Sequence, residues 1–236
     1  MGRTAQVSSY FSDPYNLTSM ESRICLLGFS GSVLSLIFST LEEMAWSQPV
    51  LILENIEVMD EVPFQSKVPY RRIWHEEYIP QPGDAYCFSV LKPAIKKTVF
   101  DFFLSHHGIT RDRYMSIVHP SVVMSASSIV DNGVYIEPGC VISPYAKIGF
   151  GVSVNRGCTI GHHTHIDDFT TVNPGTHIAG HCKVGAHSSI GIGTTVFDHI
   201  TIGSGCVIGG GSVVNRNITD DVQAFGNPCK VKVKVE

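Results

Sequence analysis

The stretch VNRGCTIGHHTHIDDFTTVNPGTHIAGHCKVG, residues 154–185, carries an aliphatic residue at every sixth position. These aliphatic residues are Val154, Ile160, Ile166, Val172, Ile178 and Val184. The same register extends from Val118 to Val214 without a break or an inserted segment. A fixed short period sustained over such a length is the sequence signature of a repeat architecture. The stretch therefore predicts a hexapeptide repeat.

A mostly small side chain follows four residues after each aliphatic position, and we expect it to point inward as well. Examples are Cys140, Ala146, Cys158, Thr164, Thr170, Thr176, Cys182, Ser188, Thr194, Cys206 and Ser212. Glycines such as Gly157 and Gly175 lie between the expected strands, where they permit the sharp bends that corners require. We expect the short strands to wind into a triangular parallel β-helix with three repeats in each coil. The cysteines at the small position are then packing residues.

The composition indicates a globular chain whose main partner is a small molecule. Its 236 residues, of which 43% are hydrophobic and 16% charged, can bury a sizeable core. The net charge is -4 and lysine and arginine form no run, which argues against a nucleic-acid partner. The longest apolar stretch, Ile24–Phe38, is interrupted by glycine and serine, so we expect no membrane span. Seven cysteines without a CxxC pair indicate reduced thiols and a cytoplasmic location.

The chain before the repeat alternates between strand and helix patterns. Strands are expected at 23–31, 49–55 and 85–90, with helices from about 31 to 44 and over 93–108. This order predicts a small α/β domain with a parallel sheet. We divide the chain into a mobile extension (1–20), the α/β substrate domain (21–116), the β-helix (117–222) and a C-terminal tail (223–236). The fold class is therefore mainly β, with a small Rossmann-like α/β domain in front.

The coil period assigns neighbours to the histidines of residues 155–169. Residues 18 apart lie above one another in successive coils, at roughly 4.8 Å. His163, His181 and His199 share a column that begins at Tyr145 and that we expect to continue to Asn217. We interpret this column as a stacked polar corner. We expect no metal there, because ligands stacked along a coil do not converge tetrahedrally.

His162 belongs to a different column, in which the residue one coil above is Gly180. The missing side chain at Gly180 leaves room for a substrate atom to approach the imidazole, and its backbone N–H is free to meet a carbonyl oxygen. A base beside an oxyanion donor is the arrangement that acyl transfer needs. This geometry also fits a second interpretation, in which His162 is an ordinary exposed residue and Gly180 a turn glycine. His165 is expected to be solvated.

Residues 154–185 resemble the core of the hexapeptide-repeat acyltransferases, in particular the bacterial nucleotide-sugar N-acetyltransferases of the bacillosamine and perosamine type and the related sialic acid O-acetyltransferases. Asn155 and His162 fall on the Asn and His of that family's Asn-x6-His segment, and Ala179-Gly180 falls on the pair whose amide meets the thioester carbonyl. The resemblance implies a left-handed β-helix, a homotrimer and acetyl-CoA as the acyl donor.

Two further segments extend the resemblance into the last coils. GGGS, residues 209–212, contributes Gly209 and Gly210, whose bare backbone could lie against pantetheine. GNPCK, residues 226–230, is similar to the family's usual ending and places Lys230 near the coenzyme phosphates.

The sequence departs from the family pattern at three places. His163 stands where an acidic residue usually follows the catalytic histidine, and Thr171 stands where a second histidine is frequent. The family's N-terminal Gly-x-x-Gly-His-Gly loop is GFSGSV here, residues 28–33, and the Asp pair after the second strand is Glu54-Asn55. We still expect these segments to bind the sugar nucleotide. The expected substrate-binding residues are Gly28, Ser30, Gly31, Ser32, Glu54 and Asn55.

Together these observations predict an acetyl-CoA-dependent enzyme that acetylates the amino group of a nucleotide-linked amino sugar. His162 is the expected general base, His163 has an accessory part, and Asn155 positions the acceptor. No cysteine has an exposed, activated setting, so we expect direct attack without an acyl-enzyme. The alternatives are a sugar O-acetyltransferase, a zinc enzyme similar to γ-type carbonic anhydrases, and a non-catalytic sugar-binding scaffold.

Overall fold

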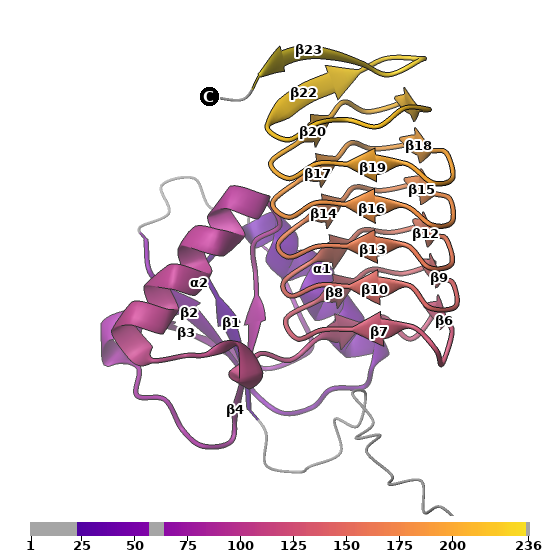
Figure 1. The fold of residues 1–236 in the computed structure, drawn as a ribbon. Helices are drawn as coiled ribbons and strands as arrows, with labels where there is room; N and C mark the ends of the chain where they lie inside the picture. The colour runs from indigo at the N-terminus through magenta and orange to yellow at the C-terminus, as the bar shows by residue number, and fades with distance from the viewer. Residues whose placement is uncertain (1–22, 57–63, 235–236) are drawn as a thin grey trace, which may run out of the picture.

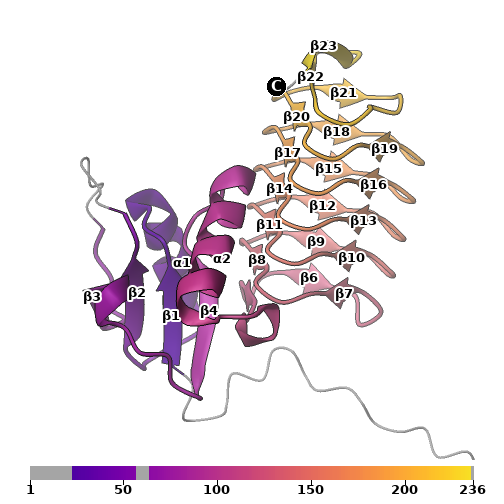
Figure 2. The same ribbon diagram turned by 60° about the vertical axis from the view of Figure 1, so that its left-hand side comes forward.

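The computed structural model describes residues 23–56 and 64–234 and contains an α/β part followed by a β-helix (Figure 1). The expected extension, residues 1–20, lies outside the described residues. The α/β part packs against one side of the β-helix, as the second view also shows (Figure 2).

The α/β part is a four-stranded parallel sheet with one long helix on each side. Its elements are β1 (Arg23–Leu27), α1 (Gly31–Glu43), β2 (Val50–Glu54), β3 (Tyr70–Trp74), the short helix η1 (His75–Glu77), β4 (Asp84–Phe88), α2 (Pro93–His107) and the short helix η2 (Arg111–Arg113). The strand order is β3-β2-β1-β4, and every pair is parallel, as predicted. The sequence did not predict β3, because this edge strand is largely exposed and shows no apolar alternation.

The β-helix consists of two-residue strands that form three sheets. The first sheet contains β5 (Ile117–Val118), β8 (Tyr135–Ile136), β11 (Ser153–Val154), β14 (Thr171–Val172), β17 (Ser189–Ile190), β20 (Val207–Ile208) and the longer β22 (Val222–Phe225) and β23 (Lys230–Lys234). The second contains β6 (Val123–Met124), β9 (Val141–Ile142), β12 (Thr159–Ile160), β15 (His177–Ile178), β18 (Thr195–Val196) and β21 (Val213–Val214). The third contains β7 (Ile129–Val130), β10 (Lys147–Ile148), β13 (His165–Ile166), β16 (Lys183–Val184) and β19 (Thr201–Ile202).

The interior of the β-helix is built from the two residue positions that the sequence predicted. From Ile136 to Val214 the aliphatic residues of the register are buried, and Cys140, Cys158, Cys182 and Cys206 are buried beside them. Burial raises the pKa of the Cys182 thiol, as expected for an inert packing side chain. The strand pairs join residues 18 apart, for example Ser153 with Thr171.

The register changes above the last regular coil. Ile202 pairs with Ile218 and Val207 with Gln223, so the offset there is 16 residues instead of 18. The expectation that Asn217 continues the histidine column is therefore wrong. Asn217 instead accepts a hydrogen bond from the backbone N–H of Thr201 at 2.8 Å. The segment expected as a tail contains β23, which pairs antiparallel with β22 across the end of the β-helix.

The α/β part docks on the first sheet of the β-helix through an aromatic cluster and a buried lysine. Phe88 and Tyr114 pack with Phe150 and Phe169 of the coils. Lys96 of α2 is fully buried, and its ammonium donates to Gly151 O at 2.7 Å and Ser153 Oγ at 3.1 Å. Thr171, at the position where the family often has a second histidine, donates its hydroxyl to Leu91 O instead.

The buried lysine makes the stability of the chain depend on pH. Burial lowers the pKa of Lys96 to about 7, whereas a lysine in the unfolded chain titrates near about 10.4. Between these values the unfolded chain binds the extra proton, so the free energy of unfolding rises with pH by up to about 1.4 kcal/mol per unit. The measurement is urea unfolding of the wild type and of Lys96→Met at pH 7 and pH 9. We expect the free energy of unfolding of the wild type to rise relative to that of the variant between these two pH values. Parallel pH curves would contradict this prediction.

Candidate active site

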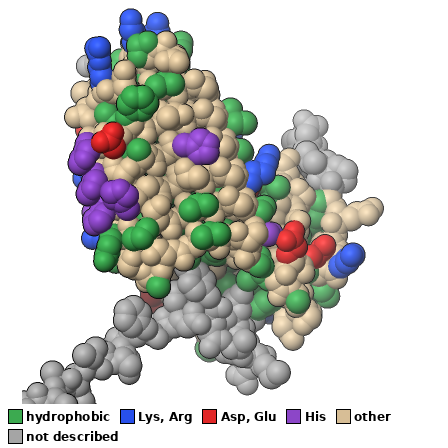
Figure 3. Space-filling model, turned by 90° about the vertical axis from the view of Figure 1, so that its right-hand side faces the viewer, with side chains coloured by type: hydrophobic (Ala, Val, Ile, Leu, Met, Phe, Trp, Pro, Cys, Tyr) green, Lys and Arg blue, Asp and Glu red, His purple; other side chains and the backbone are tan. Residues whose placement is uncertain are grey.

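Four histidines of the repeat, His162, His163, His181 and His199, lie along one edge of the β-helix, where the second sheet turns into the third, and Figure 3 shows a group of histidines at one edge. The α/β part contacts the first sheet at β8, β11 and β14, so this edge is the corner of the triangular coil opposite to that sheet. Tyr145, His163, His181 and His199 stack along the edge with ring centroids 4.7 to 4.9 Å apart. The predicted column is confirmed up to His199.

These four residues adopt a backbone conformation that is unusual for their type. Their φ angles lie between 56° and 61°, in the left-handed region that side chains other than glycine seldom adopt. At the corner between the first and second sheets, the corresponding residues from Gly139 to Gly211 are glycine, for example Gly157 and Gly175. At this backbone position the histidine edge therefore carries ring side chains, whereas the corner between the first and second sheets carries glycine.

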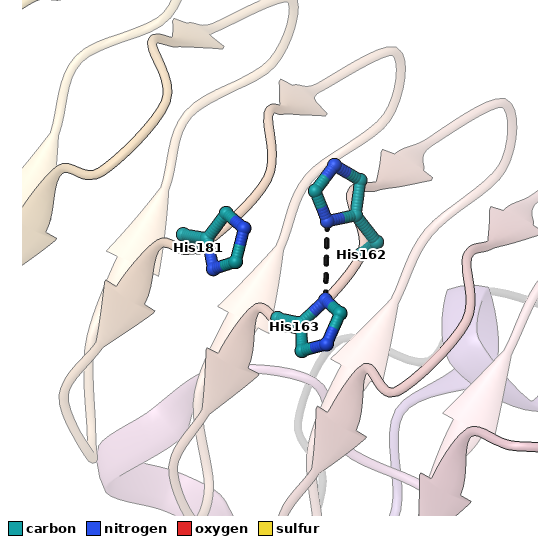
Figure 4. A group of neighbouring side chains, drawn as sticks. All are labelled: His162, His163 and His181. Carbon is teal, nitrogen blue, oxygen red and sulfur yellow. Dashed lines mark hydrogen bonds between the residues drawn. The ribbon is translucent and has the colours of Figure 1, made fainter.

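His162 immediately precedes the stacked column and stands perpendicular to it (Figure 4). Its Nδ1 lies 3.1 Å from Nδ1 of His163. His163 therefore supplies the hydrogen-bonding partner that an acidic residue at this position would have provided. When His163 Nδ1 accepts, His162 donates from Nδ1 and keeps a free lone pair on Nε2.

The imidazole of His162 lies directly over the backbone of Gly180. A Cβ added at Gly180 would be 2.8 Å from both Cε1 and Nε2 of His162. The absence of a side chain at Gly180 therefore makes room for the imidazole itself, which a side chain at this position would displace. The N–H of Gly180 donates no hydrogen bond within the described part of the chain, whereas that of Ala179 is bonded to Val196 O at 3.0 Å. An available N–H thus lies beside the imidazole.

Asn155 is not part of the His162 edge of the same chain. It lies before β12 and His162 after it, so the two residues occupy different corners of the coil. Asn155 is 5% exposed, and its Oδ1 has no hydrogen-bond partner among the described residues. Glu137, one coil below, is also buried with Oε1 unpaired, although its Oε2 accepts from Arg156 at 3.1 Å. This corner therefore presents two buried oxygen acceptors without donors.

A second candidate site is a cavity of about 610 Å³ in the α/β part. It lies at the carboxyl ends of β1, β2 and β4, where ligands of open parallel sheets bind. The predicted residues Gly28, Ser30, Gly31, Ser32 and Asn55 line it.

Glu54, the sixth predicted substrate-binding residue, does not line the cavity. Its carboxylate pairs with Arg72 at the sheet edge instead. Phe29 and Lys92 line the cavity without having been predicted. Lys92 lies in the segment between β4 and α2. Because ligands of parallel sheets bind at the carboxyl ends of the strands, this position could have been predicted from the sequence.

The glycines predicted to bind coenzyme have packing reasons for lacking a side chain. A Cβ at Gly209 would lie 2.6 Å from Cβ of Phe225, and a Cβ at Gly210 would lie 2.9 Å from Cγ2 of Ile192. Lys230, at the start of β23, is exposed. Its role stays a prediction.

No family model and no curated protein matches this chain. Solved structures do. The acetyltransferase domain of PglB from Neisseria gonorrhoeae FA1090, in complex with acetyl coenzyme A, superposes with a TM-score of 0.76 at 21% identity, covering 90% of this chain and 100% of that one. A mutant of perosamine N-acetyltransferase from Caulobacter crescentus, in complex with CoA and GDP-perosamine, gives 0.76 at 21% identity, covering 92% and 99%.

WeeI from Acinetobacter baumannii AYE gives a TM-score of 0.70 at 17% identity, covering 89% of this chain and 100% of that one. Within the described residues, no helix is both long and apolar enough to cross a membrane. The chain has the fold that its repeat and the family resemblance predicted, a left-handed parallel β-helix preceded by a small α/β part, and it shares this fold with these solved structures.

Proposed function

We propose that the protein transfers an acetyl group from acetyl-CoA to the amino group of a nucleotide-linked amino sugar. The observation that carries the proposal is the His162 imidazole over the Gly180 backbone, with Nε2 of the one and the N–H of the other both available. A general base and an oxyanion donor side by side are what direct acyl transfer requires. The likeness of the whole chain to acetyltransferases that bind CoA supports the same chemistry.

In the proposed reaction, His162 Nε2 removes a proton from the sugar amine as its nitrogen forms a bond to the thioester carbonyl carbon. The N–H of Gly180 stabilises the negative charge that develops on the carbonyl oxygen. The C–S bond then breaks, and the proton on His162 goes to the departing thiolate of CoA. His163 acts as a positioning residue, because its Nδ1 fixes His162 in the tautomer with a free Nε2. No cysteine takes part, since all seven are buried.

The proposed site forms between two copies of the chain. Asn155 and His162 occupy different corners, and the α/β cavity lies on the side of the β-helix away from His162. A site that uses the base, the acceptor-positioning Asn155 and a nucleotide in the cavity therefore needs a neighbouring chain. We propose a homotrimer. Asn155 Oδ1 and Glu137 Oε1 are buried acceptors without a donor among the described residues, so this corner is the place where an added donor group would gain a partner once the side chains open.

The cavity of the α/β part is the proposed binding place of the nucleotide. The N-terminus of α1, with Gly31 and Ser32 in its first turn and no acidic residue there, favours phosphate oxygens. Lys92, the residue that precedes α2, adds a cation to the lining of the cavity. Phe29 also lines the cavity, but it is largely buried and Arg72 lies over its ring at 4.4 Å.

The proposal is tested by measuring CoA release from acetyl-CoA with a panel of UDP-, dTDP- and GDP-linked amino sugars, and with the matching sugars that carry a hydroxyl instead of the amine. We expect turnover with an amino sugar and the acetylated nitrogen in the product by mass spectrometry. Turnover of the hydroxyl sugars alone would identify an O-acetyltransferase. A chain that binds neither acetyl-CoA nor a nucleotide sugar would overturn the proposal.

A further inference from the structure

The histidine edge combines two features that acetyl transfer does not require. Three imidazoles, those of His162, His163 and His181, place one ring nitrogen each within 4.8 Å of the others. Two of these residues, His163 and His181, hold left-handed φ angles of 58° and 56°. Such a conformation in a residue other than glycine costs of the order of 1–3 kcal/mol, and Phe169 and His187 adopt it at the corner between the third and first sheets.

The distances resemble those between ligands on a common metal ion. Zinc–imidazole bonds of about 2.0–2.1 Å at tetrahedral angles place two ligand nitrogens roughly 3.3 Å apart. The two Nδ1 atoms of His162 and His163 are 3.1 Å apart, and their ring planes are inclined at 89°. Perpendicular ring planes intersect in a line, so one ion can lie in the plane of both rings.

The third imidazole needs only a side-chain rotation to join them. His181 is stacked on His163 at an interplanar angle of 15°, and two parallel rings cannot both have one ion in their plane. His181 is exposed, and the terminal torsion of a histidine side chain has a broad energy minimum. A water molecule can supply the fourth ligand, because all three residues are at the surface.

We infer that His162, His163 and His181 form a binding site for a divalent transition-metal ion that prefers imidazole ligands, such as Zn²⁺. The exposed carboxylate of Asp198, one coil above Gly180, adds a favourable negative charge at this edge. The described residues bring together no other group of three metal-ligating side chains. The metal replaces the proton between His162 and His163, so metal binding and this hydrogen bond exclude each other.

The site does not depend on the proposed function, but the two are linked through His162. An imidazole bound to metal through Nδ1 carries its proton on Nε2 and cannot accept another one. If the proposed function holds as well, Zn²⁺ inhibits acetyl transfer. This inhibition needs both proposals, whereas metal binding needs only the present one.

The experiment is a calorimetric titration of the whole chain, prepared without a polyhistidine tag, with Zn²⁺ and with no other substrate present. We expect one ion per chain. His163→Asn and His181→Asn should each weaken binding by at least about tenfold, the lower end of the loss seen when even an outer-shell partner is removed. Asparagine is the substitution of choice because it tolerates a left-handed φ.

His177→Asn is the matched control, since His177 is also exposed but lies on β15 and shares a hydrogen bond with Thr159 Oγ1. X-ray absorption of the zinc-loaded chain should show nitrogen ligands at about 2.0–2.1 Å with imidazole scattering. The inference is overturned if the chain does not bind Zn²⁺, or if His177→Asn weakens binding as much as His181→Asn. Neither outcome bears on acetyl transfer, which is measured in the absence of metal.

Discussion

Replacing His162 with asparagine is expected to lower kcat by about 10² to 10⁴ and to leave the proposed trimer intact. The magnitude is that of a lost general base. His162 is exposed and its side chain contributes nothing to the buried interior, so the variant should fold like the wild type. The measurement is the steady-state rate of CoA release at saturating substrates, with circular dichroism and light scattering to establish the folded assembly.

His165→Asn is the control for His162→Asn. His165 lies only three residues away, but it is on β13 between Lys147 and Lys183 and has no contact with Gly180. Its substitution should leave kcat nearly unchanged. If the His162→Asn variant is active and the His163→Asn variant is inactive, the general base is His163 and the proposed role of Gly180 is wrong.

Gly180→Ala is expected to lower kcat by about two orders of magnitude. The added methyl group would be 2.8 Å from Cε1 and Nε2 of His162, so the imidazole has to move away from the Gly180 N–H. A displacement of about 1 Å in a catalytic group can cost 10²-fold in rate. Gly180 is outside the left-handed region of φ, so the alanine acts through this contact and not through backbone strain. Steady-state kinetics of the variant test the prediction.

The double variant separates this mechanism from simple damage to the fold. If Gly180→Ala acts by displacing the imidazole, it should cost little further activity in the His162→Asn background, where no imidazole remains. Equal fold-losses in the two backgrounds would show that the alanine acts elsewhere, for example on the coil above.

The fold could be predicted because a β-helix repeats one simple rule. The period of six specifies which side chains enter the core, and the coil length follows from three sheets, so columns such as Tyr145, His163 and His181 can be assigned by counting. The same counting failed at Asn217, because nothing in the period indicates that the last turn pairs at an offset of 16 residues. Edge strand β3 was missed because its exposed residues carry no pattern.

The candidate site could be predicted only in part, because side-chain directions do not follow from a register. The sequence placed Gly180 above His162 but could not reveal that the imidazole folds over it. The sequence showed that His163 replaces the acidic residue of the family, but it did not reveal that the His163 ring hydrogen-bonds to Nδ1 of His162. It also grouped Asn155 with His162, although the two residues belong to different corners of the coil. Such relations depend on side-chain directions and on the placement of the coil corners in space, which the period does not specify.

The most direct test of the central claim is a crystal structure of the His162→Asn variant with acetyl-CoA. The account predicts that the thioester carbonyl oxygen accepts a hydrogen bond from the N–H of Gly180, at a nitrogen–oxygen distance of about 2.7–3.2 Å. It also predicts that the coenzyme lies between two chains, with the position of the missing imidazole facing the acetyl group. A thioester bound elsewhere, with the Gly180 N–H directed at solvent, would contradict the account.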